Sequence, residues 1–377
     1  MQFRDLGAQY KALKPEIDAG IQAVIDSNAF ILGKPVTELE NKLAAYVGRK
    51  YCVACANGTE ALQLALMAWD IGPGDAVFTS DFTYFASAGC ASIIGATPIL
   101  VDIDLTTFNI SPEALETEIK RVITEGKLKP KAIIPVDLFG LPADYTKILP
   151  IAKKYGLKVL EDAAQGFGGR INDQIACSFG DISATSFFPA KPLGCYGDGG
   201  AIFTDDEAID ARLRSLRAGG KSPLDKYDNR EIGMNSRLDT LQAAILLPKF
   251  KAFVDYELEA VNKVAKWYDE RLNDRFVIPT IPEGFYSSWA QYTILLGSRE
   301  ERDAMQQHLK EKGIPSMVYY PRGLHQQAAY KWMGLTDKPY PNTVAATKRV
   351  LSLPMHPYLT EDVVEKIVGH MVAIAHD

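Results

Sequence analysis

The chain has 377 residues, 47% of them hydrophobic and 23% charged, which is enough apolar material for two packed domains and too much for a disordered protein. Its 41 basic and 47 acidic residues are interspersed rather than gathered in blocks, and they leave a formal net charge of −6. A basic surface for nucleic acid is therefore not expected.

The N-terminus and the cysteines indicate a protein of the reducing cytoplasm. The first 20 residues carry charged side chains at short intervals, which excludes the apolar core of a signal peptide. Five cysteines, an odd number at scattered positions, do not form the disulfide framework of a secreted chain. An uncharged stretch at 82–101 is long enough to span a bilayer, but its small and polar residues weaken its hydrophobicity. We interpret it as a buried helix followed by a strand.

The first two thirds of the chain alternate short apolar or β-branched runs with longer segments of helical spacing. Seven runs are predicted to be strands: 51–55, 76–80, 98–102, 132–136, 158–161, 182–187 and 200–204. Most are separated by predicted helices, such as 59–69, 112–124 and 145–155. This alternation predicts an α/β fold with a mainly parallel sheet covered on both faces.

The pattern changes at Asn235 to a long helical run, 238–272, in which Pro248 should kink the helix or end its first half. A strand at 290–296 and helices at 300–312 and 362–375 follow. We therefore predict a large domain over 1–245 and a smaller C-terminal α/β domain over 246–377.

Several familiar motifs are incomplete. The segment 219–222 ends like a phosphate-binding P-loop, but Ser215 stands where that loop needs glycine. A dinucleotide-binding Gly-x-Gly-x-x-Gly does not follow the first strand. Cys52 and Cys55 face opposite sides of a strand and are predicted to be buried small side chains. The histidines show no metal-ligand spacing and the chain has no Gly-x-Ser-x-Gly elbow, so no metal or serine hydrolase site is expected.

Four polar segments lie at predicted strand ends, where an open α/β sheet binds its ligand. The first, 57–60, opens a helix after the first strand; its backbone N–H groups and the Thr59 hydroxyl could hold a phosphate, and Gly58 permits close approach. A capped helix start explains the same residues equally well. The fourth, 81–84, carries aromatic rings that could stack on a planar ligand.

The other two segments carry opposite charges. In 161–165, two acids end a buried apolar run, and a carboxylate there is costly unless it meets a cation such as a protonated pyridine nitrogen. In 186–191, a lysine follows a buried strand among aromatic and proline residues, where desolvation lowers its pKa and frees its amine for a Schiff base. Pyridoxal 5′-phosphate requires a phosphate-binding turn, an aromatic ring to stack on, an anion for its ring nitrogen and an amine, and the four segments together supply them.

These segments also resemble a known family, the DegT/DnrJ/EryC1/StrS sugar aminotransferases, over nearly the whole chain. The resemblance rests on 57–59, 161–165, 186–191, 197–200 and 235–239. It implies the fold-type I architecture of pyridoxal-phosphate-dependent aminotransferases: a mostly parallel seven-stranded sheet with flanking helices and a smaller C-terminal domain.

The resemblance assigns a role to each site residue. Lys191 would bind the cofactor covalently and later move the proton between the substrate carbon and the cofactor. Asp162 would pair with the ring nitrogen, Gln165 would contact the ring hydroxyl and Tyr84 would stack on the ring. The phosphate would be bound by Gly58, Thr59 and Ser186, and by Asn235 of a neighbouring subunit. A homodimer with shared active sites is implied.

Three further segments, 191–200, 241–249 and 353–358, resemble the members that act on UDP-linked hexuluronic acids. Those members add an amine at C3 of a UDP-linked 3-keto-N-acetylglucosaminuronic acid, with glutamate as donor, on the way to diacetamido uronic acids of bacterial surface polysaccharides such as the lipopolysaccharide O-antigen.

On the substrate side, Arg237 is the candidate for the sugar carboxylate, since a guanidinium suits a bidentate anion; a structural ion pair with Asp239 is the alternative. The family's His-Tyr-Pro-x-Pro-Leu-His reads Tyr-Tyr-Pro-Arg-Gly-Leu-His at 319–325, so a histidine and a proline are missing. We expect Tyr320 and His325 to contact the substrate, although His325 could instead pack under the loop.

Other functions stay open on sequence alone. One is amination at C4 of another nucleotide-linked keto sugar, and another is a non-catalytic regulatory protein that binds pyridoxal phosphate. Dehydratases among the relatives carry histidine where this chain has Lys191, which argues against that activity. An NAD oxidoreductase is disfavoured by the missing glycine fingerprint.

Overall fold

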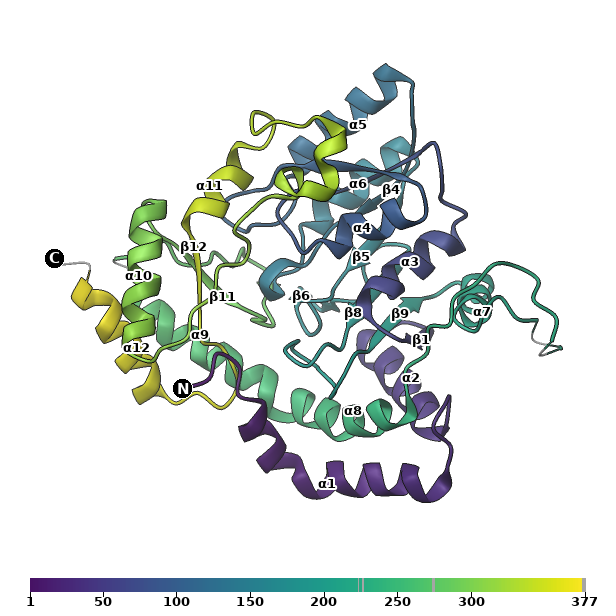
Figure 1. The fold of residues 1–377 in the computed structure, drawn as a ribbon, viewed down its shortest axis with the longest axis horizontal. Coiled ribbons are helices and arrows are strands. Elements are labelled where there is room, and N and C mark those ends of the chain that lie inside the picture. Colours follow the sequence, from purple (N-terminus) through teal and green to yellow (C-terminus); the bar gives the residue numbers. More distant parts are fainter. Residues whose placement is uncertain (223, 226, 273–274, 375–377) are drawn as a thin grey trace.

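The computed structural model describes residues 1–222, 224–225, 227–272 and 275–374. Its centre is a seven-stranded sheet in the order β1-β9-β8-β5-β4-β2-β3. Figure 1 labels β1, β9, β8, β5 and β4 of this sheet. The strands are β1 (Tyr51–Cys55), β2 (Asp75–Ser80), β3 (Thr97–Val101), β4 (Lys129–Ile134), β5 (Lys158–Asp162), β8 (Ile182–Ser186) and β9 (Gly200–Thr204). Only β9 is antiparallel to its neighbours. All seven predicted strands and the mainly parallel sheet are confirmed.

Helices cover both faces of the sheet, which explains why its strands are continuous apolar runs. One face packs on α3 (Gly58–Ala68), α4 (Ala86–Ile93) and α7 (Glu207–Leu216). The other packs on α2 (Lys34–Val47), α5 (Pro112–Glu125), α6 (Tyr145–Tyr155) and α8 (Thr240–Ala252). Cys52 lies in the core of the second face and Cys55 in that of the first, both buried, as the alternation of a strand predicts.

The predicted long helix 238–272 is present, with a change of geometry inside it. Pro248 lies within α8, which continues to Ala252 before a five-residue π segment (Phe253–Glu257) and α9 (Leu258–Leu272). Proline cannot donate a hydrogen bond to the carbonyl of Ala244. A Cβ added at Gly20 of α1 (Leu6–Ser27) would lie 3.2 Å from that carbonyl oxygen, so the two helices approach closely there.

The C-terminal elements match the prediction closely. Two antiparallel strands, β11 (Tyr292–Leu295) and β12 (Val350–Leu353), are flanked by α10 (Arg299–Glu311), α11 (Pro341–Arg349) and α12 (Glu361–Ile374). Ala375, the last residue of the predicted closing helix, lies outside the described residues. One hydrophobic cluster runs from α2 to α12, on both sides of residue 245, so the division into domains at that point stays a prediction.

Short elements complete the described chain. A small sheet joins β10 (Phe285–Tyr286), β6 (Arg170–Ile171) and β7 (Gln174–Ile175), and single turns of 3-10 helix occur at Leu138–Gly140 and Leu324–Gln326, with a longer one at Ala328–Met333. The uncharged stretch 82–101 folds as α4 and β3, as predicted. Within the described ranges, every helix is too short or too polar to cross a membrane.

Candidate functional site

A cavity of about 880 Å³ opens at the carboxyl ends of the parallel strands. Its walls come from the segments that follow β1, β2, β5 and β8, together with residues 319–322. Because parallel strands end at one edge of the sheet, residues far apart in sequence meet there. Eight predicted site residues line this cavity: Gly58, Thr59, Tyr84, Asp162, Gln165, Ser186, Lys191 and Tyr320.

A turn between β1 and α3 forms one end of the cavity. The Asn57 side chain caps α3 by accepting a hydrogen bond from the Glu60 N–H (2.9 Å). A Cβ at Gly58 would lie 2.7 Å from the Ser186 Cβ, so only glycine lets the turn lie against the end of β8. Free N–H groups at the start of a helix attract phosphate, and Thr59 and Ser186 stand beside them.

The Asp162 carboxylate is buried at the end of β5. It accepts hydrogen bonds from the Ser87 hydroxyl (2.8 Å) and from the Ala164 N–H (3.2 Å). Burial raises the pKa of Asp162, and those two hydrogen bonds and the charge of Lys191 oppose that rise. A positively charged group in the cavity would be stabilised by this carboxylate.

Lys191 follows β8 in a tight turn, in which its N–H donates to the Phe188 carbonyl (2.8 Å). Burial lowers the pKa of the Lys191 amine to about 8; Asp162 raises that pKa and Arg4 lowers it. A lowered pKa increases the share of neutral, nucleophilic amine at neutral pH. The sequence prediction of a desolvated lysine is therefore supported by the structure.

Arg4 lies behind Lys191, and sequence reasoning did not identify it. Its guanidinium donates to the Lys191 carbonyl oxygen (2.9 Å) and to the Ala290 carbonyl oxygen (3.5 Å). Burial lowers the pKa of Arg4 to about 10. A sequence gives no local signal for a contact between residues 187 positions apart.

Gln165 connects the backbone at Phe139 to the loop that contains Tyr320. Its Oε1 accepts from the Phe139 N–H (2.8 Å), and its Nε2 donates to the Tyr320 hydroxyl (3.0 Å). Tyr84 also lines the cavity, and 59% of its surface is exposed, so its ring is accessible for stacking. Ser87, which holds Asp162, was not predicted as a site residue.

Asn235 and Arg237 lie outside this cavity, on the segment between α7 and α8. Asn235 is exposed and pairs with Ala218 in an isolated bridge. Within the part of the chain that the structure describes, Arg237 forms no ion pair with Asp239 or any other acid. The structural alternative suggested for Arg237 is thus not observed.

His325 lies beneath the loop 319–324 and does not line the cavity. Its Nδ1 lies 2.6 Å from an Asp81 carboxylate oxygen and its Nε2 lies 2.9 Å from Asp337 Oδ1. The ring stacks on Tyr340 with 4.5 Å between centroids. Both ring nitrogens are therefore engaged within the chain, and a contact between His325 and a sugar stays a prediction.

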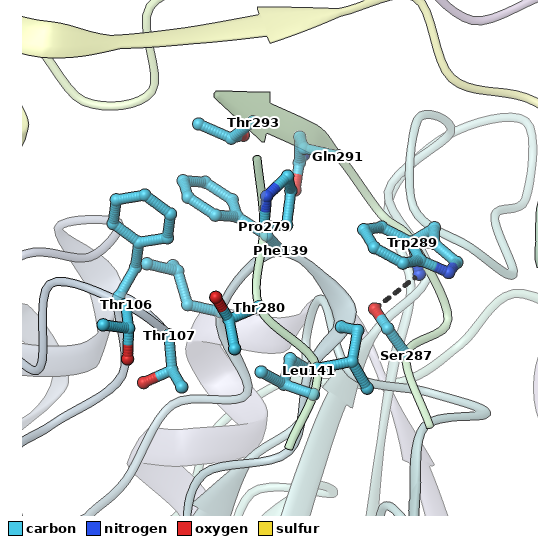
Figure 2. A pocket seen from close by; sticks show the side chains of 13 residues that line it. Thr106, Thr107, Phe139, Leu141, Pro279, Thr280, Ser287, Trp289, Gln291 and Thr293 are labelled. Atoms are coloured by element: carbon cyan, nitrogen blue, oxygen red, sulfur yellow. Dashed lines mark hydrogen bonds between the residues drawn. The ribbon is translucent and has the colours of Figure 1, made fainter. Parts of the chain in front are cut away.

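A second cavity, of about 20 Å³, borders the first, and Figure 2 shows the side chains that line it. Apolar side chains such as Phe139, Leu141 and Trp289 surround it, and Gln291 borders both cavities. Its volume holds about one water molecule and excludes a cofactor or a sugar. The cavity of about 880 Å³, which eight predicted site residues line, is therefore the candidate site.

Comparison with known proteins gives consistent matches over nearly the whole chain. The model of the DegT/DnrJ/EryC1/StrS aminotransferase family matches residues 11–372. The UDP-2-acetamido-2-deoxy-3-oxo-D-glucuronate aminotransferase of Pseudomonas aeruginosa is 46% identical over 360 residues, which cover 95% of this chain and 96% of the relative. The structure of a DegT/DnrJ/EryC1/StrS aminotransferase from Brucella abortus superposes with a TM-score of 0.96 at 47% identity and covers 100% of both chains. That of NtdA from Bacillus subtilis, with bound cofactor PMP, has a TM-score of 0.84 at 28% identity and covers 97% of this chain and 82% of its own.

Proposed function

The chain belongs to the DegT/DnrJ/EryC1/StrS aminotransferase family, and we propose that it transfers the amino group of glutamate to C3 of a UDP-linked 3-keto-N-acetylglucosaminuronic acid. It is an enzyme with the aminotransferase fold, and its cofactor is pyridoxal 5′-phosphate. Likeness to the Pseudomonas aeruginosa enzyme, whose name gives a UDP-linked 3-oxo-glucuronate as its substrate, supports the choice of sugar.

One observation carries the proposal: the half-buried Lys191 and the buried Asp162 carboxylate share a cavity with the turn at Gly58. The residues fit the cofactor for two reasons. A Cβ at Gly58 would fill the space between the turn after β1 and Ser186, where the phosphate would bind. The buried Asp162 carboxylate favours a cation in the cavity. When bound, the cofactor supplies a carbon that reacts with amines and a ring that withdraws electrons.

The residues of the chain then divide the work. The Lys191 amine would hold the cofactor covalently and would be the base that moves a proton at the reacting carbon. Asp162 would stabilise a protonated ring nitrogen, and Ser87 and the Ala164 N–H hold Asp162 in place. Gln165 would contact the ring hydroxyl and Tyr84 would stack on the ring. The phosphate would be bound by three residues: Gly58, Thr59 and Ser186.

Substrate binding and assembly complete the proposal. Arg237 and Tyr320 contact the sugar nucleotide and His325 packs under the loop of Tyr320, while Asn235 reaches the phosphate in the site of a partner subunit, so the enzyme works as a homodimer in the cytoplasm. The exposed position of Asn235, outside the cavity of its own chain, is consistent with a role across an interface. The product enters bacterial surface polysaccharide, such as the lipopolysaccharide O-antigen.

The test is the visible spectrum of the purified enzyme, recorded before and after glutamate and again after a UDP-linked keto sugar. We expect an absorption band that glutamate removes and that only a UDP-3-keto uronic acid restores. A protein that takes up no pyridoxal phosphate would overturn the assignment of Lys191. Return of the band with a 4-keto sugar instead would show that the enzyme aminates C4.

A variant pair isolates the role of Lys191. Lys191→Ala should abolish turnover and prevent covalent capture of the cofactor by borohydride, because no other amine replaces it. Lys331→Ala removes an exposed lysine outside the cavity and should behave as wild type. Covalent capture by Lys191→Ala, seen by mass spectrometry, would refute the assignment.

A further inference from the structure

The charges that line the active cavity are unevenly distributed. Its acids are Glu60, Asp162 and Asp198, whereas Lys191 and Arg322 are the only basic residues among the described residues that line it. Lys191 serves the cofactor in the proposed function. A substrate anion that enters this cavity therefore meets one guanidinium from the same chain, that of Arg322.

The Arg322 side chain is free to bind a ligand. It is exposed at the wall of the cavity, and within the described ranges it forms no ion pair. Most of the other arginines in those ranges are paired with a carboxylate, as Arg212 is with Asp70. An unpaired guanidinium at a cavity wall suits a carboxylate, which it can bind with two parallel hydrogen bonds.

Hydrogen bonds on both sides of Arg322 hold its loop to other segments of the chain. After it, the Leu324 N–H donates to the Asp81 carbonyl oxygen (2.8 Å) and the His325 N–H donates to the Asp81 carboxylate (2.8 Å). Before it, the Tyr320 hydroxyl accepts from Gln165 (3.0 Å). These hydrogen bonds hold the loop, so the Arg322 side chain starts from a fixed position at the cavity that Asp162 and Lys191 also line.

Gly323 makes this attachment possible. A Cβ at position 323 would lie 2.6 Å from Asp81 Oδ2 and 2.7 Å from Thr343 Cγ2, so any larger residue would push the loop away from Asp81. The glycine stands where the family pattern has proline, and it follows Arg322 directly. This departure from the pattern thus has a structural consequence for the residue that faces the cavity.

We propose that Arg322 binds a carboxylate of the substrate and so makes the enzyme prefer acidic over neutral sugars. The inference rests on the proposed function, in which the uronic acid and glutamate occupy this cavity in turn. A carboxylate is the anionic group that these two substrates share. Arg322 acts from within the chain, whereas Arg237 lies outside the cavity of its own chain.

The test is calorimetric binding of two analogues to the holoenzyme: UDP-N-acetylglucosaminuronic acid and UDP-N-acetylglucosamine, which differ only at C6 of the sugar. Arg322→Gln should weaken binding of the acid by roughly tenfold to a hundredfold, the range for a hydrogen bond to a charged group, and change binding of the neutral analogue less than about threefold. The affinity of Arg322→Lys for the acidic analogue should lie between those of wild type and Arg322→Gln. Arg299→Gln removes an exposed arginine that does not line the cavity and serves as the matched control.

A second arm separates the two sources of the carboxylate. The rate at which glutamate removes the visible band is measured against glutamate concentration in wild type and Arg322→Gln. An increase in the half-saturating concentration of about tenfold or more assigns Arg322 to the donor as well. Loss of acid binding alone assigns it to the sugar, and an effect on glutamate alone assigns it to the donor.

Two results would overturn the inference. Equal weakening of the acidic and neutral analogues would place Arg322 on the diphosphate or the nucleotide, and no effect in either arm would leave it without a role in binding. A wild-type enzyme that binds the acidic analogue but converts no UDP-keto sugar would refute the proposed function instead, and the binding comparison would still decide the role of Arg322. Gly323→Ala should weaken binding of the acid, because its Cβ would displace the loop that carries Arg322.

Discussion

Replacing Asp162 with asparagine tests the electrostatics of the site with little change of shape. The carboxylate accepts hydrogen bonds from Ser87 and from the Ala164 N–H. Asparagine can keep both contacts, because its oxygen accepts from the Ala164 N–H and its amino group can donate to the Ser87 hydroxyl. Exchanging hydrogen bonds to a charged group for neutral ones costs about 0.5–1.5 kcal/mol, and relief from burying a charge offsets part of that cost. We therefore expect the free energy of unfolding to change by no more than about 1.5 kcal/mol.

The effect on catalysis should be much larger. Truncating one partner of a buried charge pair costs about 2–5 kcal/mol, which is about a thirtyfold to five-thousandfold loss of rate at 1.36 kcal/mol per factor of ten. The pKa of Lys191 should also fall below about 8, because Asp162 raises it in the wild type. The variant therefore loses rate at the proton-transfer step while it retains the fold.

The assay is the single-turnover rate with glutamate, followed by the visible spectrum from pH 6 to 10, with urea denaturation to check stability. Asp198→Asn is the control, since Asp198 also lines the cavity but is exposed. A rate for Asp162→Asn within about threefold of wild type would refute the role given to this carboxylate.

Three further predictions follow from single positions. Gly58→Ala should lower the affinity for pyridoxal phosphate at least about tenfold and destabilise the fold by about 1–3 kcal/mol, because its Cβ would lie 2.7 Å from Ser186; cofactor titration measures this, and Gly369→Ala, a site with no atom within 4 Å, should cost nothing. Burial lowers the pKa of His356 to about 4, so the unfolded chain takes up a proton more readily between pH 6.5 and 4, and the free energy of unfolding should fall on acidification, by about 2 kcal/mol at pH 5. Urea denaturation at pH 7 and pH 5 should show a smaller difference in His356→Gln, and an unchanged difference would contradict this explanation. Arg237→Ala should weaken use of the uronic acid by about tenfold or more and spare a neutral sugar; equal kcat/KM losses for both would show that Arg237 does not recognise the carboxylate.

Much of the fold could be read from the sequence because its signals are local. Each sheet strand is a short buried run between helical segments, and all seven were predicted within three residues of their observed ends. Because parallel strands end at one edge, the order of Asp162 and Lys191 along the chain was enough to bring them to one cavity. Pro248 was predicted to kink the helix or end its first half, whereas α8 continues past it to Ala252 before the π segment begins.

The sequence by itself determined the sheet and the position of the lysine and the aspartate at its edge, because apolar periodicity and residue type are properties of neighbouring positions; the chemistry of these two residues stays a prediction. Only the tertiary structure decided what surrounds them. Arg4 reaches Lys191 across 187 positions, and Asp81 holds His325 and the loop of Arg322 across 244. No local pattern encodes such contacts, because they form only when folding brings distant segments together. Each buried polar group then forms a hydrogen bond with a partner that the fold places beside it.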